Sequence, residues 1–152
     1  MIRIPTLVAA VTLALVATGE VRADLTKARA ERNLGRRARM ALDNANAQFE
    51  IASKGYINAG WGETKAALDE VLESVELALT SLDQTGKKPR NSRDYKNLEI
   101  KTNALLKRLG DFFERVSFNE REQVNGIKER IQKIHDDTLM AVMGEQKAKK
   151  KK

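Results

Sequence analysis

Apolar side chains that return every three or four positions constrain the fold of this 152-residue chain more than any other feature. The clearest case is the segment ETKAALDEVLESVELALTSLDQTG, residues 63–86. This spacing puts the apolar residues on one face of an α-helix, with glutamates on the opposite face. Gly86, followed by Pro89, predicts where this helix ends. Its apolar positions are Leu68, Val71, Leu72, Val75, Ala78, Leu79 and Leu82.

A seven-residue repeat follows the predicted loop TGKKPRNS, residues 85–92. Ser92 or Asn91 can cap the start of this helix by accepting a hydrogen bond from a backbone N–H. The repeat is typical of a helix that packs in a seam against other helices. Gly110, inside it, weakens the helix by about 1 kcal/mol relative to alanine. The repeat positions are Tyr95, Leu98, Thr102, Leu105, Leu109, Phe112 and Val116.

The segment VSFNERE, residues 116–122, predicts a break before a last helix that ends at Gly144. Either Ser117 with Glu120 or Asn119 with Glu122 fits a capping box, in which two side chains satisfy unpaired N–H groups. The alternative is one long, bent helix. The core positions predicted for the last helix are Val124, Ile127, Ile131, Ile134, Leu139 and Val142.

The first helix is predicted from Leu25 to about Lys54, with a break near its start at Gly35. Residues 27–39 are mostly basic and residues 63–83 mostly acidic, so these helices should attract each other as antiparallel neighbours, by about 0–1 kcal/mol for each exposed pair. We interpret this as a bias in packing order. No stretch shows the period-two alternation of strands. The narrow apolar stripe of the first helix comprises Leu34, Ala38, Ala41, Ala45, Phe49 and Ala52.

These patterns predict an all-α protein, in which residues 24–144 form an antiparallel bundle of three or, in our preferred interpretation, four long helices. Residues 1–23 read as a signal peptide, with Arg3, an uncharged run over residues 4–18 and cleavage after Ala23. An uncleaved anchor is the rival interpretation, but a spanning helix needs about 20 apolar residues. We therefore expect an exported protein, periplasmic or secreted, with no transmembrane segment after cleavage.

The charge excess lies mainly in a lysine-rich tail, residues 145–152, which is predicted to be disordered. From residue 24 onward the chain has 26 basic and 20 acidic residues, and removal of residues 147–152 leaves 21 and 20. The sequence therefore does not predict a basic-faced domain. The chain has no cysteine, which excludes disulfides and thiolate metal sites. The tail lysines, which are candidates for contact with a partner, are Lys147, Lys149, Lys150, Lys151 and Lys152.

The stretch ASKGYINAGWGETKAALDEVLESVELAL, residues 52–79, resembles one helical hairpin of the tetratricopeptide type. Ala52, Tyr56 and Gly60 match its small, aromatic and turn positions, whereas Ala66 comes one place late and no second copy follows. The resemblance implies an αα-hairpin with a pairing surface.

The chain after the signal peptide also resembles small exported all-helical proteins of soil bacteria whose function is not characterised. The stretches that carry the resemblance are RARMALDNANAQF, SLDQTGKKPRNS, VSFNEREQV and IHDDTLMAVMG. It implies export and an all-α fold, and it transfers no site residue.

His135 is the only histidine, and we interpret it as a partly exposed residue beside the seam, with Ile134 in the core position. Asp136 and Asp137 lie about 100° and 200° around the helix from His135, so the three cannot converge on one metal ion. We therefore expect no metal and no cofactor. The alternative is a haem b bundle, in which Met40 and His135 reach the same height on the first and last helices. Covalent haem attachment is excluded, because the chain lacks Cys-x-x-Cys-His.

Trp61, the only tryptophan, stands between Gly60 and Gly62 and is predicted either to plug an open end of the bundle or to anchor a partner. Tyr56, Trp61 and the tail lysines are the candidate partner-binding residues. The chain has no nucleophile elbow and no phosphate-binding glycine loop. We therefore predict a non-catalytic exported protein that binds a protein or an anionic envelope component, and no specific nucleic acid. The alternatives are a haem or small-ligand carrier and a structural or stress-related envelope protein.

Overall fold

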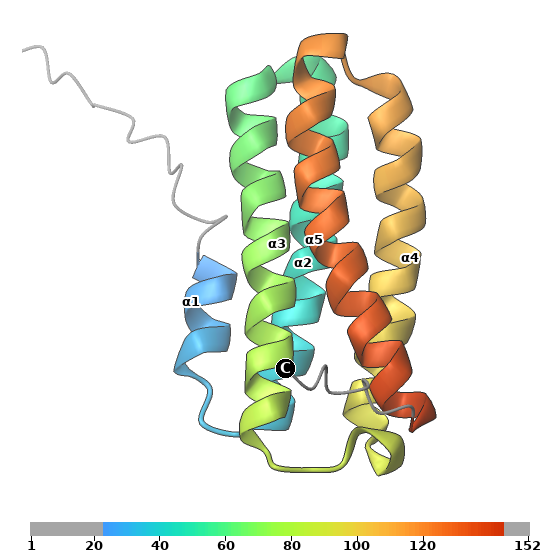
Figure 1. Ribbon diagram of the computed structural model, residues 1–152. Helices are drawn as coiled ribbons and strands as arrows, with labels where there is room; N and C mark the ends of the chain where they lie inside the picture. Colours follow the sequence, from blue (N-terminus) through green and yellow to red (C-terminus); the bar gives the residue numbers. More distant parts are fainter. Residues whose placement is uncertain (1–22, 145–152) are drawn as a thin grey trace, which may run out of the picture.

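Four long α-helices make up most of residues 23–144, which are the residues that this computed structural model describes (Figure 1). They are α2 (Leu34–Asn58), α3 (Trp61–Gln84), α4 (Arg93–Arg115) and α5 (Phe118–Met143). A short α1 (Ala23–Ala30) precedes them, and a 3-10 turn, η1 (Pro89–Asn91), lies between α3 and α4. No strand occurs within these residues, which confirms the all-α prediction. Apart from Ala23, the predicted signal peptide and the lysine tail lie outside the described residues.

Local capping side chains fix where the helices begin. The segment predicted as one first helix forms two helices, α1 and α2. Asn33 is the N-cap of α2, and its side chain accepts a hydrogen bond from the Arg36 N–H at 2.9 Å. The break therefore precedes Gly35 and does not lie at it. Ser92 caps α4, as predicted. Ser117 and Glu120 form the capping box that starts α5, so the single bent helix is wrong.

The helices form two antiparallel hairpins, α2–α3 and α4–α5, that pack side by side with α2 beside α4 and α3 beside α5 (Figure 1). Three ion pairs show that α2 and α4 run in the same direction, because residue numbers rise together along both helices. Helices that follow each other in the chain are thus antiparallel, whereas helices that meet across the seam between the two hairpins are parallel. The pairs that cross this seam are Arg39–Asp94, Asp43–Lys101 and Glu50–Arg108.

The core is two apolar clusters with a polar layer between them. Asn44 donates to Ser74 Oγ at 3.0 Å within the first hairpin, and Thr102 Oγ1 lies 3.1 Å from His135 Nδ1 within the second. Asn44 and Thr102 lie ten and nine positions after the first residues of α2 and α4, and Ser74 and His135 lie ten and eight positions before the last residues of α3 and α5. These helix termini are at the same end of the bundle, so the four residues share one height. One cluster contains Ala45, Val75, Leu105 and Ile131, and the other contains Leu42, Ala78 and Leu98.

The seven-residue repeat of α4 is confirmed, because all seven of its predicted positions are buried. The prediction for α5 fails after Ile131. Ile134 and Leu139 are only partly buried, and His135 and Thr138 take the core positions instead. The physical reason is the helical period, since steps of four and three from Ile131 reach 135 and 138. The predicted step of five residues, from Ile134 to Leu139, does not follow the buried face of the helix.

Replacing Gly110 with alanine is expected to raise the free energy of unfolding by about 0.5–1 kcal/mol. The residue lies inside α4, and a Cβ built there meets no atom within 4 Å beyond the helix's own backbone. Gly60 is the matched control, because its φ of +86° is unfavourable for any other residue. Urea unfolding followed by circular dichroism should show opposite signs for Gly110→Ala and Gly60→Ala. Destabilisation by both would contradict the expectation.

Candidate functional site

His135 is buried, with 7 % of its surface exposed, which corrects the prediction of a partly exposed residue beside the seam. The Thr102 hydroxyl donates its proton to a backbone carbonyl, at 2.8 Å from Leu98 O or 3.0 Å from Glu99 O. We assign the proton between the two side chains to His135 Nδ1, because in this tautomer the Thr102 hydroxyl can donate to a carbonyl and also accept from the imidazole. His135 is a member of the polar layer of the core.

Within residues 23–144, no group of three or more histidine and acidic side chains is arranged to hold a metal ion. Met40, the other residue of the haem alternative, is partly buried against the apolar cluster of Leu42, Ala78 and Leu98. The haem alternative and the expectation of no cofactor both stay predictions.

Tyr56 and Trp61, the two aromatic candidates, lie together where α2 turns into α3. Their rings meet edge to face at 6.4 Å, and Trp61 packs, partly buried, against the cluster of Ala45, Val75, Leu105 and Ile131. This position agrees with the plug interpretation of Trp61. A role for either residue in contact with a partner stays a prediction.

The Tyr56 hydroxyl ties the turn between α2 and α3 to the turn between α4 and α5. It donates to Glu120 Oε2 at 2.7 Å and accepts from the Ser117 N–H at 2.9 Å. The hydrogen bond from Tyr56, followed by that from Ser117, holds the pKa of Glu120 below its usual value. The two hairpins are therefore fastened to each other at this end.

Two large apolar side chains are exposed beside this fastening. Ile57 is 83 % exposed and Phe118 is 87 % exposed, and each is the chain neighbour of a residue in the Tyr56–Ser117 hydrogen bond. We call the end formed by residues 54–65 and 111–122 the apolar end. It has four basic and five acidic side chains, a net charge of −1.

The opposite end of the bundle is strongly basic. It is formed by residues 31–39, where α2 begins, and residues 83–94, where α3 ends and α4 begins (Figure 1). We call this the basic end. It has three acidic side chains and a net charge of +5. Its eight cations are Arg32, Arg36, Arg37, Arg39, Lys87, Lys88, Arg90 and Arg93.

Most of this positive charge faces water without an acidic partner. Arg36 pairs with Glu31 at 3.3 Å and Arg39 with Asp94 at 2.7 Å. The side chains of five other cations of the basic end are exposed and make no hydrogen bond or ion pair with another described residue. They are Arg32, Lys87, Lys88, Arg90 and Arg93.

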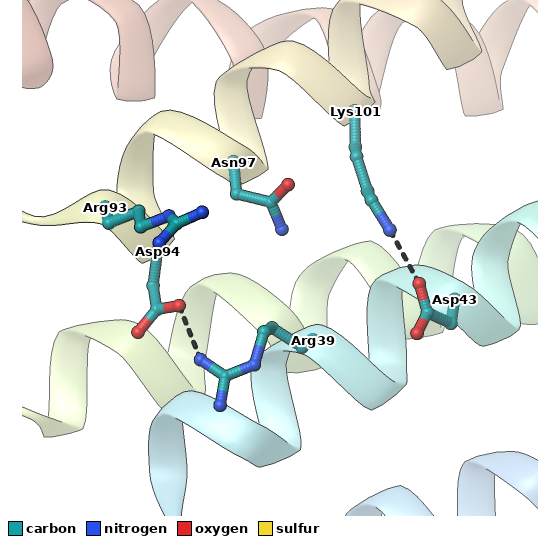
Figure 2. Close-up of a pocket in the computed structure, with 6 residues that line it drawn as sticks. All are labelled: Arg39, Asp43, Arg93, Asp94, Asn97 and Lys101. Carbon is teal, nitrogen blue, oxygen red and sulfur yellow. Dashed lines mark hydrogen bonds and ion pairs between the residues drawn. The ribbon is translucent and has the colours of Figure 1, made fainter.

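A charged cleft of about 410 Å³ opens between α2 and α4 beside the basic end (Figure 2). Two ion pairs cross it, Arg39 with Asp94 at 2.7 Å and Lys101 with Asp43 at 2.6 Å. The Asn97 amide extends into the space between the pairs, and the Arg93 guanidinium lies on the same α4 wall (Figure 2). The cleft thus combines three cations, two carboxylates and one amide.

Two features position the α4 wall of this cleft. The Tyr95 hydroxyl donates to Asp83 Oδ1 at 2.6 Å, which holds the start of α4 against the end of α3. Burial first, and then the hydrogen bond to Asp83 and its charge, raise the pKa of Tyr95. Gly35 lets Asp94 approach α2, because a Cβ at Gly35 would lie 2.9 Å from Asp94 Oδ2.

The lysine tail is joined to the bundle at the basic end. Gly144, the last described residue, ends α5 with a φ of +82°, and its Cβ position is 3.4 Å from the Arg90 side chain. The five tail lysines therefore follow a residue that already lies among the cations of the basic end. Their own placement lies outside the described residues.

The sequence does not predict the basic end directly, because the net charge of the whole folded part is close to zero. Residues 31–39 and 83–94 are about fifty positions apart, so neither segment alone predicts a basic surface. The signal was present in the predicted helix ends, since antiparallel neighbours bring the start of one helix beside the end of the next.

Comparisons of this chain with protein-family models, with curated proteins and with solved structures gave no match. The two resemblances drawn from the sequence therefore stay predictions. A search of the described helices for a stretch long and apolar enough to cross a membrane finds none.

Proposed function

We propose that this protein is an exported, non-catalytic binding protein whose basic end attaches to an anionic polymer of the cell envelope. The observation that carries the proposal is the difference between the two ends of the bundle, +5 at the basic end and −1 at the apolar end. Charge of one sign that gathers on one surface attracts a polymer of the opposite sign and raises its rate of association.

The chemistry of the basic end favours a polyanion over a single small anion. Five unpaired cations spread over two chain segments can each bind a separate charge of a polymer, and each such ion pair releases a counterion. The basic end as defined contains no aromatic residue, and Tyr95, which directly follows it, is buried and hydrogen-bonded to Asp83, so base stacking is not available there. This supports charge-driven attachment and does not favour recognition of nucleic-acid sequence.

The lysine tail extends the same surface in this proposal. Its five lysines follow Gly144, so tail and basic end can contact one polymer at the same time. Export is part of the proposal because the run of residues 4–18 and the small residues after it read as a signal peptide. The proposal contains no catalytic step.

Replacing Lys87, Lys88 and Arg90 with glutamine is expected to lower the affinity for polyglucuronate at least 10-fold at 50 mM salt. Removal of these three positive charges should reduce the slope of log K against log salt by about 2, by analogy with single-stranded nucleic acids. All three side chains are exposed and unpaired among the described residues, so the fold should be unchanged. Fluorescence anisotropy with labelled polymer over a salt series measures both quantities.

The matched control is glutamine at Lys54, Lys107 and Lys128, which removes the same charge outside the basic end. The control should lose less than threefold in affinity. A variant that ends at Gly144 separates the contribution of the tail to the affinity for the polymer from the contribution of the bundle. Equal losses in both triple variants, or no binding by the wild-type protein, would overturn the proposal.

A further inference from the structure

The cleft between α2 and α4 offers more kinds of polar group than an ion site needs. Its lining comprises Arg39, Arg93 and Lys101, which donate, Asp43 and Asp94, which accept, and Asn97, which does both. About 410 Å³ lies within the range of about 300–1,000 Å³ typical of small-molecule sites. A ligand for this cleft must carry both charge and hydrogen-bonding groups.

The free donors of the cleft lie on one wall. Arg93 and Asn97 are one helical turn apart on α4, and neither side chain makes a hydrogen bond or ion pair with another described residue. A guanidinium binds a carboxylate or a phosphate through two parallel hydrogen bonds. The Arg93 guanidinium is therefore placed to take the charge of a ligand, and the Asn97 amide to take a neighbouring oxygen.

The two carboxylates keep acceptor capacity after pairing. Lys101 contacts Asp43 through Oδ1, and Arg39 contacts Asp94 through Oδ1. An ionised carboxylate has about four lone-pair positions, so each can still accept a hydrogen bond from a hydroxyl group. A sugar hydroxyl is both a donor and an acceptor, and it suits a cleft in which each wall carries one carboxylate and at least one cation (Figure 2).

We propose that this cleft binds one charged sugar unit, with its carboxylate or phosphate on Arg93 and its hydroxyls on Asn97, Asp43 and Asp94. This inference rests on the proposed function only in taking the sugar as a unit of the anionic polymer. A bare anion would use Arg93 but would face two carboxylates, and a neutral sugar would leave Arg93 without a counter-charge. The charged sugar is the ligand that satisfies both kinds of group.

The test is titration of the full chain with four probes, followed by amide chemical shifts in NMR spectra. Glucuronate and glucose 6-phosphate are expected to bind and to shift amides of residues 39–43 and 93–101. Glucose and inorganic phosphate are expected to bind at least 10-fold more weakly. Binding of only one charged sugar would support the inference and identify the charge. Inorganic phosphate binding as tightly as glucose 6-phosphate would overturn it.

Two variants tie the binding to the cleft. Arg93→Gln should weaken glucuronate binding at least 10-fold. Lys107→Gln, which also removes one positive charge from α4 but lies outside the cleft, should change it less than twofold. Arg93 is exposed, so loss of the fold is not expected, and circular dichroism checks it. Equal affinities for Arg93→Gln and the wild type would place the sugar elsewhere and overturn the inference.

The outcomes separate this inference from the proposed function. Loss of polyglucuronate binding in the Lys87, Lys88 and Arg90 variant, with glucuronate binding retained, supports both. Glucuronate binding without polymer binding supports the cleft and rejects the attachment to a polymer. Polymer binding without any of the four probes supports attachment through the basic end and rejects the sugar site.

Discussion

Replacing Phe112 with alanine is expected to lower the free energy of unfolding by about 3–5 kcal/mol. The Phe112 side chain is fully buried, and its ring meets Phe49 at 6.0 Å and Tyr56 at 5.6 Å, edge to face. These rings join α4 to α2 across the seam between the two hairpins. Removal of the Phe112 ring leaves a cavity and also loosens the Tyr56 ring, whose hydroxyl fastens the apolar end. Urea unfolding followed by circular dichroism measures the decrease.

Phe118→Ala is the matched control for this expectation. The chemical change is the same, but Phe118 is 87 % exposed at the start of α5. Its removal should change the free energy of unfolding by less than about 0.5 kcal/mol, as is usual at exposed positions. A decrease of similar size in both variants would show that Phe112 does not hold the hairpins together.

Most of the fold was predictable because helix formation and burial follow a short period. In α4, a strict alternation of three- and four-residue steps predicts that seven residues, from Tyr95 to Val116, face the core, and all seven are buried. The capping residues Ser92 and Ser117 were predictable for a similar reason, since a cap satisfies N–H groups only two or three residues away. Helical periodicity and capping both act over a few residues, so they can be recognised in the local sequence.

The side-by-side packing of the hairpins and the polar layer were not predictable, because each depends on residues distant in the sequence. The helical period places His135 on the buried face of α5, and a polar side chain is accommodated there because Thr102, on another helix, is its hydrogen-bond partner. Without that partner, hydropathy favours Ile134 for the core position. The basic end has the same origin. Residues 31–39 are basic in themselves, but only the packing of α2 against α3 and α4 joins them with residues 83–94 into one surface with the cleft.

Substitutions in the polar layer are expected to have the second large effect on the free energy of unfolding, and the size of this effect depends on whether Thr102 or His135 is replaced. Thr102→Val keeps the shape of the side chain but leaves the buried Nδ1–H of His135 without its acceptor, at a cost of about 1–3 kcal/mol. His135→Leu should cost less, because the Thr102 hydroxyl still donates to the carbonyls of Leu98 or Glu99. The reason is that an unpaired buried donor is costlier than an absent one.

The double variant separates this account from a simple loss of packing. With both changes, the layer between α4 and α5 becomes apolar and contains no unpaired group from this pair. The double variant should therefore be more stable than Thr102→Val alone, with a coupling energy of about 1–2 kcal/mol in a double-mutant cycle. Effects that simply add would mean that the 3.1 Å approach of Thr102 Oγ1 to His135 Nδ1 contributes no hydrogen bond to the stability of the bundle.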